Sequence, residues 1–483
     1  MTEREFDLIV VGAGAVGENL ADRAVQGGLS VAIVEAELVG GECSYWACMP
    51  TKALLRPGSA LRAARRVPGA REAFDGLPDA TQALRFRDGA TSSWSDAGQV
   101  SWLEGAGIEL VRGHATLDGE RRVQVTTAAG ETSTLVARSA VALCTGSAAM
   151  IPGIPGLSEA APWTNREAAA AQRVPNRLVV IGAGVVATEF ATAFSSLGSA
   201  VTMLVRGGTL LTGNEPFAGE LVAQALREAG VGIRTHTEAT SVRRADDGVH
   251  LTLTDGEEIV ADEVLVATGR RPRTESLGLE TIGLEPGAAL STDDTLRVLG
   301  PDGEPIDWLY AAGDAAGRAL LTHQGKYQAR AAGDVIAARA TGGDVDDAPW
   351  GRHVATADHA AVPQVVFTDP EVAAVGLTEQ QARDAGIPTR AVEYDMSWLA
   401  GATVHAEGYV GCAKLVIDTE RGVVVGATFA GADVAELLSS ATIAVVGEVP
   451  IHRLWHAVPA YPTLSEVWLR LLEELGRETA LSS

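Results

Sequence analysis

The sequence predicts an α/β fold with two Rossmann-like modules in one chain. Two segments that start 170 residues apart share one pattern: Asp7-Leu-Ile-Val-Val-Gly12-Ala-Gly14 and Arg177-Leu-Val-Val-Ile-Gly182-Ala-Gly184. In each segment a short β-branched run stops at a Gly-x-Gly turn and an Ala-rich helical pattern begins, which is the strand, loop and helix of a dinucleotide-binding unit. Glycine is common in tight turns, so one copy is weak support. The repetition favours two modules.

The first copy has every part of this unit. Gly12 permits the tight turn, Gly14 lets the backbone approach a pyrophosphate, and Gly17 lets the helix pack on its strand. The helix N-terminus adds N–H donors and the positive end of its dipole. Glu35 stands 21 positions after Gly14, at the end of the next strand pattern, 31–35, where a carboxylate accepts hydrogen bonds from ribose hydroxyls. We therefore expect an unphosphorylated ribose in the first module.

The second copy differs at its ribose position. Gly182, Gly184 and Ala187 form a Gly-x-Gly-x-x-Ala turn, and the position 21 residues after Gly184 is Val205, followed by Arg206. No carboxylate is available there for a ribose diol. An arginine at this point is placed to bind a 2'-phosphate, which favours NADPH over NADH without excluding NADH. The alternative is that Arg206 is a solvated strand end.

Two thiols follow the first glycine turn. Cys43 and Cys48 are separated by four residues and are followed by Pro50 and Lys52. A thiol pair of this kind can close and open a small disulfide ring beside a hydride carrier, because exchange requires only a thiolate that attacks a disulfide. Two buried small side chains or half of a metal site are the alternatives. Cys144 and Cys412 are too scattered to supply a second ligand pair, so no metal site is predicted.

Length and charge exclude several classes of protein. The 483 residues should divide into about three domains, and the 46% of hydrophobic residues suffice for a core in each. A net charge of −24 argues against nucleic acid or an anionic membrane as a partner. The N-terminus has no basic region or cleavage signal, and no segment is apolar enough to span a bilayer. With only four cysteines and no export signal, we expect the protein in the reducing cytoplasm. A Cys pair there is more often catalytic than structural, so we expect this pair to be catalytic.

These features resemble the family of FAD-dependent pyridine nucleotide-disulfide oxidoreductases, the group of glutathione reductase, dihydrolipoamide dehydrogenase and mercuric reductase. Further motifs extend the resemblance over nearly the whole chain: Cys144-Thr145-Gly146, Ala267-Thr-Gly269-Arg270-Arg-Pro272, Tyr310-Ala-Ala-Gly313-Asp314, Leu321-Thr322-His323, and the run from Val365 to Glu379. The resemblance implies a homodimeric oxidoreductase with a C-terminal α+β dimerisation domain. It divides the chain into an FAD domain (1–155 and 281–350), an NAD(P)H domain (156–280) and an interface domain (351–483).

The resemblance also assigns roles to single residues. Cys48 matches the thiol that touches the flavin and Cys43 the thiol that faces substrate, while Lys52 and Glu189 match a buried ion pair beside flavin N5. A cation there stabilises the reduced flavin, and the carboxylate keeps the lysine paired; without the resemblance Lys52 would be read as a surface lysine. Asp314 matches the residue that holds the ribityl chain. Further cofactor contacts are implied for Gly41, Thr145, Gly146, Thr322 and Gly269.

Two departures from the family affect the acceptor. Disulfide-reducing members pair a C-terminal histidine with a glutamate, but this chain has Tyr461 before Glu466. A phenol titrates near ~10, so it is a poor proton donor at neutral pH. His452 or His456 could replace the acid, or could be ordinary core or surface residues. Between the two cysteines, Tyr45, Trp46 and Ala47 either shape a pocket for a flat acceptor or pack the helix.

The resemblance to mercuric reductases is closest at Tyr461, Val185-Val186 and Val205-Arg206. Those enzymes also carry a second cysteine pair at the extreme C-terminus, whereas this chain ends Arg477-Glu-Thr-Ala-Leu-Ser-Ser483. Mercury reduction is therefore not expected as the main task. We expect electrons to pass from NADPH through FAD and the Cys43/Cys48 disulfide to an unidentified small-molecule acceptor. Direct reduction of a quinone or metal ion by the flavin, or a slow flavin-bearing redox sensor, are the alternatives.

Overall fold

The computed structural model describes residues 3–476, so the C-terminal segment that lacks a thiol lies outside the described residues. The chain forms two compact units. One contains the chain up to Pro50, together with Asp88–Ala149 and Arg270–Asp358. The other contains Thr51–Arg87, Met150–Gly269 and the chain from His359 onward. The boundaries of these two units differ from those of the four predicted domain spans, and those spans stay predictions.

The first unit is built on an eight-stranded sheet with the order β16-β17-β6-β1-β2-β3, extended by β5 and β4. Its strands are β1 (Glu3–Val11), β2 (Val31–Glu35), β3 (Ile108–Arg112), β4 (His114–Leu117), β5 (Arg122–Thr126), β6 (Thr132–Leu143), β16 (Arg297–Leu299) and β17 (Pro305–Ala311). Strand β1 pairs in parallel with β2 and β6, in the register Val11↔Val34 and Val11↔Leu143. The carboxyl ends of these strands therefore meet at one edge, where ligands of such sheets bind.

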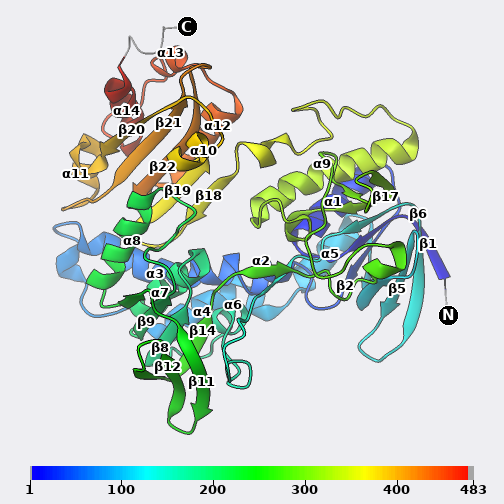
Figure 1. The fold of residues 1–483 in the computed structure, drawn as a ribbon, viewed down its shortest axis with the longest axis horizontal. Helices are drawn as coiled ribbons and strands as arrows, with labels where there is room; N and C mark the ends of the chain where they lie inside the picture. The colour runs from blue at the N-terminus through cyan, green and yellow to red at the C-terminus, as the bar shows by residue number, and fades with distance from the viewer. Residues whose placement is uncertain (1–2, 477–483) are drawn as a thin grey trace. The chain divides into compact units, whose positions relative to one another are not determined.

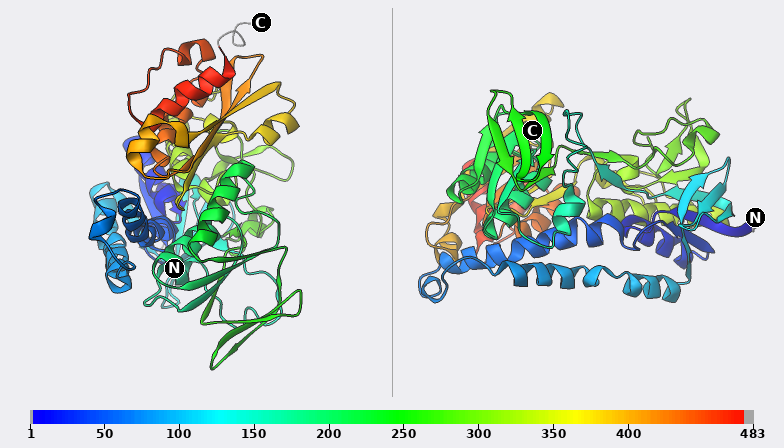
Figure 2. Two further views of the ribbon diagram at one scale, coloured as in Figure 1. Left: turned by 90° about the vertical axis from the view of Figure 1, so that its left-hand side faces the viewer. Right: turned by 90° about the horizontal axis from the view of Figure 1, so that it is seen from below.

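Two helices cover this sheet, α1 (Ala15–Gln26) and α9 (Thr322–Thr341), and they lie side by side (Figures 1 and 2). Gly333 of α9 makes this close approach possible, because a Cβ there would meet the Arg23 Cβ at 2.6 Å. Leu20, Ala21 and Ala24 of α1 are buried in the core. The unit also contains α2 (Gly41–Tyr45), α5 (Ala97–Gly105) and the small sheet of β7 (Ser147–Ala149) and β15 (Arg270–Pro272).

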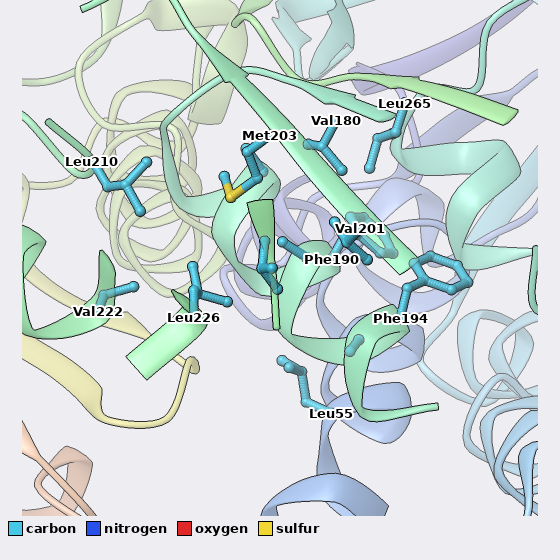
Figure 3. Close-up of a cluster of buried hydrophobic side chains, with 14 of the residues drawn as sticks. Leu55, Val180, Phe190, Phe194, Val201, Met203, Leu210, Val222, Leu226 and Leu265 are labelled. Carbon is cyan, nitrogen blue, oxygen red and sulfur yellow. The ribbon is translucent and has the colours of Figure 1, made fainter. Parts of the chain in front are cut away.

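The second unit contains a four-stranded parallel sheet, β10-β9-β8-β14, with α7 (Val185–Ser196) and α8 (Pro216–Glu228). Its strands are β8 (Arg177–Ile181), β9 (Ala200–Val205), β10 (Gly232–Thr235) and β14 (Glu263–Val266). Helix α7 is apolar along most of its length, and every residue from Ala187 to Phe194 is buried. Phe190 and Phe194 pack with Leu55 of α3 (Cys48–Arg65) and the inner side chains of β8 and β9 (Figure 3). A three-stranded sheet, β11 (Ala239–Ala245), β12 (Gly248–Leu253) and β13 (Glu258–Ala261), forms a second core with other side chains of β8, β9 and β14.

The C-terminal part of the second unit is a five-stranded antiparallel sheet, β18-β19-β22-β21-β20. Its strands are β18 (Pro363–Val366), β19 (Glu371–Gly376), β20 (Thr389–Asp395), β21 (Cys412–Asp418) and β22 (Val423–Gly431), and its helices include α10 (Glu379–Asp384), α12 (Leu438–Val446) and α14 (Val467–Leu475). Helix α14 packs on β20 and β21 (Figure 2, left). The predicted fold class, two Rossmann-like modules with a C-terminal α+β domain, is confirmed. Among the described residues, no helix is long and apolar enough to cross a membrane.

Candidate active site

The first glycine turn joins β1 to α1 and has the geometry that the sequence predicts. Gly12 has φ +100°, and a Cβ there would lie 2.5 Å from the Cys144 carbonyl oxygen. A Cβ on Gly17 would collide with the Gly12 carbonyl oxygen, so only glycine lets α1 approach the turn this closely. Gly14 and Gly146 face open space instead. The turn therefore leaves its backbone accessible where a pyrophosphate would approach.

The carboxylate at the end of β2 is held by the backbone around it. Glu35 Oε2 accepts from the Ala13 N–H at 2.8 Å, and Oε1 accepts from the Glu37 N–H at 2.8 Å. Burial raises the pKa of Glu35, although these hydrogen bonds favour its charged form. Each oxygen retains a second lone pair for a ribose hydroxyl. The ribose contact predicted for Glu35 stays a prediction, and its carboxylate is preorganised for it.

Buried polar atoms support a dinucleotide at this turn. Thr145 Oγ1 and Glu18 Oε1 are buried, and neither has a hydrogen-bond partner within residues 3–476. Both lie on elements of the first module, the loop after β6 and the first turn of α1. These unpartnered atoms and the open glycines fit the FAD that the resemblance implies, because such a cofactor carries many groups that can form hydrogen bonds. Sequence reasoning missed Glu18, because an acidic residue in the first turn of a helix is ordinary.

A chain of hydrogen bonds holds the side chain of Asp314, whose contact with the ribityl chain stays a prediction. Ser147 donates to Asp314 Oδ2, and Arg270 Nε donates to Ser147 Oγ at 2.7 Å. Arg270 Nη2 also reaches Glu42 Oε1 at 3.4 Å, beside Cys43 in α2. The cation thus joins the loop of Asp314 to the helix that carries the first thiol. Ser147 and Glu42 were not predicted, because neither has a motif of its own.

The thiols Cys43 and Cys48 are both partly buried and are not joined in a disulfide. Cys48 Sγ lies 3.3 Å from Thr322 Oγ1, at the start of α9. A hydrogen bond with Cys48 raises the pKa of Cys43, and burial adds to the shift. Two thiols this close do not ionise together readily, so the Cys43 thiol holds its proton more tightly than an ordinary cysteine. Sequence reasoning had assigned only the backbone of Thr322 to the site, so this hydroxyl contact is new.

The predicted ion pair is present in the second unit. Lys52 Nζ donates to Glu189 Oε2 at 2.8 Å, and Glu189 Oε1 accepts from the Phe367 N–H at 3.0 Å. Lys52 Nζ also lies 4.9 Å from the centre of the Phe367 ring. Glu189 is only 2% exposed, and both of its oxygens are bonded. Glu189 is therefore a satisfied buried charge, and Lys52, whose side chain is 35% exposed, is its paired cation and not an unpaired surface lysine.

The second glycine turn follows β8. Gly182 has φ +143°, and a Cβ there would collide with the Ala267 carbonyl oxygen, whereas Gly184 faces open space. Ala187 is fully buried where the first module has its third glycine. Arg206 is exposed just beyond β9, and within the described chain it forms no ion pair. Its cofactor role and that of Gly269, which has φ +143°, stay predictions.

The structure does not bring Tyr461 and Glu466 together. Tyr461 is 76% exposed, and no hydrogen bond to it is found within residues 3–476. Glu466 is buried, and its Oε1 accepts from Arg470 Nη2 at 2.5 Å, but its Oε2 has no partner in the described chain. His452 and His456 are exposed on and after α13 (Ile451–Leu454). No proton donor is therefore positioned by Glu466.

One of the bulky residues between the two thiols has a packing role. Tyr45 is 2% exposed, and its hydroxyl donates to Gln99 Oε1 at 2.6 Å, so this ring packs α2 against α5. The partly buried Trp46 lies 5.6 Å from the Tyr45 ring, centre to centre. Of the two alternatives for this linker, packing therefore applies to Tyr45. The described residues contain no cluster of three or more His, Cys, Asp or Glu side chains that could hold a metal ion.

Comparisons with known proteins cover almost the whole chain. Residues 6–334 match the family described as pyridine nucleotide-disulphide oxidoreductase, and residues 362–471 match the dimerisation domain of that family. The chain is 33% identical to the dihydrolipoyl dehydrogenase of Thermus scotoductus, over 98% of each chain. It is 32% identical to the mercuric reductase of Shigella flexneri, over 95% of this chain and 79% of that one.

Two solved structures share the fold. LpdA from Mycobacterium tuberculosis is 25% identical and superposes with a TM-score of 0.80, over 98% of this chain and all of that one. A Cu(II) complex of the HOCl-induced flavoprotein disulfide reductase RclA from Escherichia coli is 22% identical, with a TM-score of 0.82, over 97% of this chain and 99% of that one.

Proposed function

This chain belongs to the pyridine nucleotide-disulphide oxidoreductase family, and we propose that it passes electrons from NADPH through FAD and the Cys43/Cys48 disulfide to a small-molecule acceptor. The family confirms that the protein is an enzyme that uses FAD and NAD(P)H. Its dimerisation domain supports a homodimer. The choice of NADPH, the acceptor and a location in the cytosol belong to the proposal.

The observation that carries this proposal is the hydrogen-bonded thiol pair. Cys48 Sγ lies 3.3 Å from Thr322 Oγ1, and the pKa of Cys43 is raised by its hydrogen bond with Cys48 and by burial. When bound, FAD supplies two-electron transfer between a hydride donor and a disulfide. The protein places a hydroxyl beside one sulfur and makes the other thiol harder to deprotonate. The family pattern assigns attack on an acceptor to Cys43, which must first lose its proton.

The acceptor is limited by the supply of protons. A departing thiolate must be protonated, and a positioned acid near pH 7 contributes about 10² to 10⁴ in rate. Tyr461 is exposed and has no bond to Glu466, so it does not provide this acid. We therefore propose that small disulfides such as oxidised glutathione or lipoamide are poor substrates.

A second candidate function is direct reduction of a quinone or a metal ion, and the missing acid favours it. An acceptor that takes electrons from the flavin needs no proton at the thiols. The similarity to mercuric reductases makes metal ions a reasonable class to test. A flavin-bearing redox sensor that cycles its disulfide slowly is the third candidate.

The experiment is a steady-state assay of NADPH oxidation with a panel of disulfides, quinones and metal ions, in the wild type and in Cys43→Ser. Loss of activity in the variant identifies acceptors that use the dithiol. Retained activity identifies acceptors that use the flavin. If every acceptor fails, the sensor is favoured and the proposal of an enzyme with fast turnover is wrong.

A further inference from the structure

The ribose edge of the second module is formed by two neighbouring strand ends. Strands β9 and β10 are parallel partners, and Val205 pairs with Thr235. The residues that follow, Arg206 and His236, therefore leave the sheet side by side. This is the carboxyl edge of the strands, where a dinucleotide binds. Sequence reasoning found Arg206 by counting from the glycine turn, but no count leads to His236.

Backbone contacts hold His236 against the loop of Arg206. The His236 N–H donates to the Gly207 carbonyl at 3.0 Å, and the Thr237 N–H donates to the Val205 carbonyl at 3.2 Å. His236 has φ +52°, a left-handed conformation that few residues other than glycine adopt. A Cβ on Gly208 would lie only 3.2 Å from His236 Nε2. The imidazole therefore lies directly beside this glycine loop.

The loop itself offers a single cation. Residues 207–214 contain no Lys, Arg or His, so a second basic side chain for a phosphate must come from another segment. His236 is exposed, and within residues 3–476 neither its ring nor the Arg206 guanidinium has a hydrogen-bond or ion-pair partner. Both side chains are thus available to a ligand. A phosphate accepts several hydrogen bonds at once, and an imidazole N–H is a suitable donor.

A cavity that this loop also lines is a poorer place for a phosphate. It has a volume of about 400 Å³ and lies between Gly208–Leu210 and α8. Its lining carries two carboxylates, Glu220 and Glu228, against one guanidinium, Arg227. This charge disfavours an anion. The phosphate position therefore falls on the face of Arg206 and His236.

We propose that His236 is a specificity-determining residue that binds the 2'-phosphate of NADPH together with Arg206. This inference rests on the NADPH preference in the proposed function and adds a second contact to it. If the ring instead stacked on the adenine, it would act equally on ligands with and without a 2'-phosphate. The two roles therefore differ in a measurable way.

The test compares adenosine 2',5'-bisphosphate with 5'-AMP as ligands of the FAD-loaded protein, by titration calorimetry. The variants are His236→Asn, Arg206→Ala and, as a control with an exposed histidine outside the module, His114→Asn. Asparagine tolerates the left-handed backbone, so His236→Asn keeps the loop. We expect His236→Asn to raise the Kd for the bisphosphate roughly 3- to 30-fold, the range of one hydrogen bond to a charged group at an exposed site. The Kd for 5'-AMP should change less than twofold, and His114→Asn should change neither.

Each other outcome has a defined meaning. Equal weakening of both ligands, or no weakening, overturns the role of His236. His236→Gly, which also accepts the backbone conformation, must show the same selective loss, and a melting curve of each variant checks that it is folded. If the wild type binds both ligands equally, the NADPH preference itself is wrong, and this inference falls with it. A wild-type preference that His236→Asn retains contradicts this inference alone.

Discussion

The two thiols occupy different surroundings although they lie only five positions apart. Cys48 Sγ has a hydroxyl neighbour in Thr322, whereas the pKa of Cys43 is raised by its hydrogen bond with Cys48 and by burial. The other two cysteines are unsuited to exchange. Burial raises the pKa of Cys144 to about 12 and that of Cys412 to about 11, so both are thiols at neutral pH.

This asymmetry predicts different spectra for two serine variants. On partial reduction, the FAD-loaded wild type should show a long-wavelength band from a thiolate beside the flavin. Cys48→Ser should abolish the band because it removes the sulfur that carries the charge. Cys43→Ser should retain it. The measurement is an anaerobic absorbance titration, and identical spectra of the two variants would overturn the assignment of roles.

The burial of Glu18 predicts that the free energy of unfolding depends on pH. Burial raises its pKa from 4.5 to about 7. The folded protein therefore holds a proton that the unfolded chain loses, so this residue lowers the free energy of unfolding as the pH rises from about 4.5 to 7. Above pH 7 the cost is constant, at roughly 3 kcal/mol. Glu18→Gln should raise Tm by a few degrees at pH 8 and by less at pH 5.5. An equal change at both pH values would contradict the assigned burial.

Replacing Tyr461 by histidine should increase the reduction of small disulfides. Tyr461→His places an imidazole five positions before Glu466, whose buried Oε2 has no partner in the described chain. An acid that titrates near neutral pH should raise kcat for a small disulfide by about tenfold or more. Tyr461→Phe is the matched control and should leave the slow wild-type rate unchanged. If Tyr461→Phe destroys disulfide turnover, the phenol is a working acid and the substrate argument fails.

At the scale of elements, one buried lysine connects four segments of the second unit. Lys414 of β21 contacts Glu215 at 2.9 Å, Glu379 at 2.9 Å and Glu393 at 2.8 Å. Glu215 precedes α8, Glu379 begins α10, and Glu393 is on β20. Burial alone would lower the pKa of Lys414, but the three carboxylates outweigh it and raise the pKa. The lysine thus fixes the start of α8 on the C-terminal sheet.

Removing this cation should destabilise the protein strongly. Lys414→Met leaves Glu215, whose side chain is 3% exposed, as an unpaired buried charge, and the cost of such a loss is about 3 to 5 kcal/mol. The double variant Lys414→Met, Glu215→Gln should recover part of it, because the second change removes that charge. Thermal melts of both variants test this. A Tm of Lys414→Met within one degree of the wild type would show that the cluster contributes nothing to stability.

Elements were predictable where a local pattern determines them. Both glycine turns and their strands were found from motif and spacing, whereas the pair of Lys52 with Glu189 was implied by the family resemblance. Sequence reasoning missed Ser147, Glu42 and the proposed residue His236, because their partners come from segments that are distant in the chain. Their positions depend on sheet register and on backbone contacts, which leave no mark in the spacing of residues. Tyr45 was left undecided for the same reason, because its partner Gln99 lies on another helix.

At the scale of the whole molecule, the predicted family and fold class were correct. The family match confirms the oxidoreductase part and the C-terminal dimerisation domain. The chemistry of the acceptor was not predictable, because the fold supports many acceptors and the decision depends on a few side chains. Tyr461 and Trp46 are those that differ most from the family pattern.

The central claim is that electrons from NADPH reach the disulfide, and an anaerobic NADPH titration with thiol labelling tests it most directly. The FAD-loaded protein is reduced stepwise and alkylated, and the labelled cysteines are identified by mass spectrometry. Two new thiols should form for each NADPH consumed in the first step, at Cys43 and Cys48, while labelling of Cys144 and Cys412 stays constant. Reduction of the flavin without any new thiol at Cys43 or Cys48 would contradict the claim.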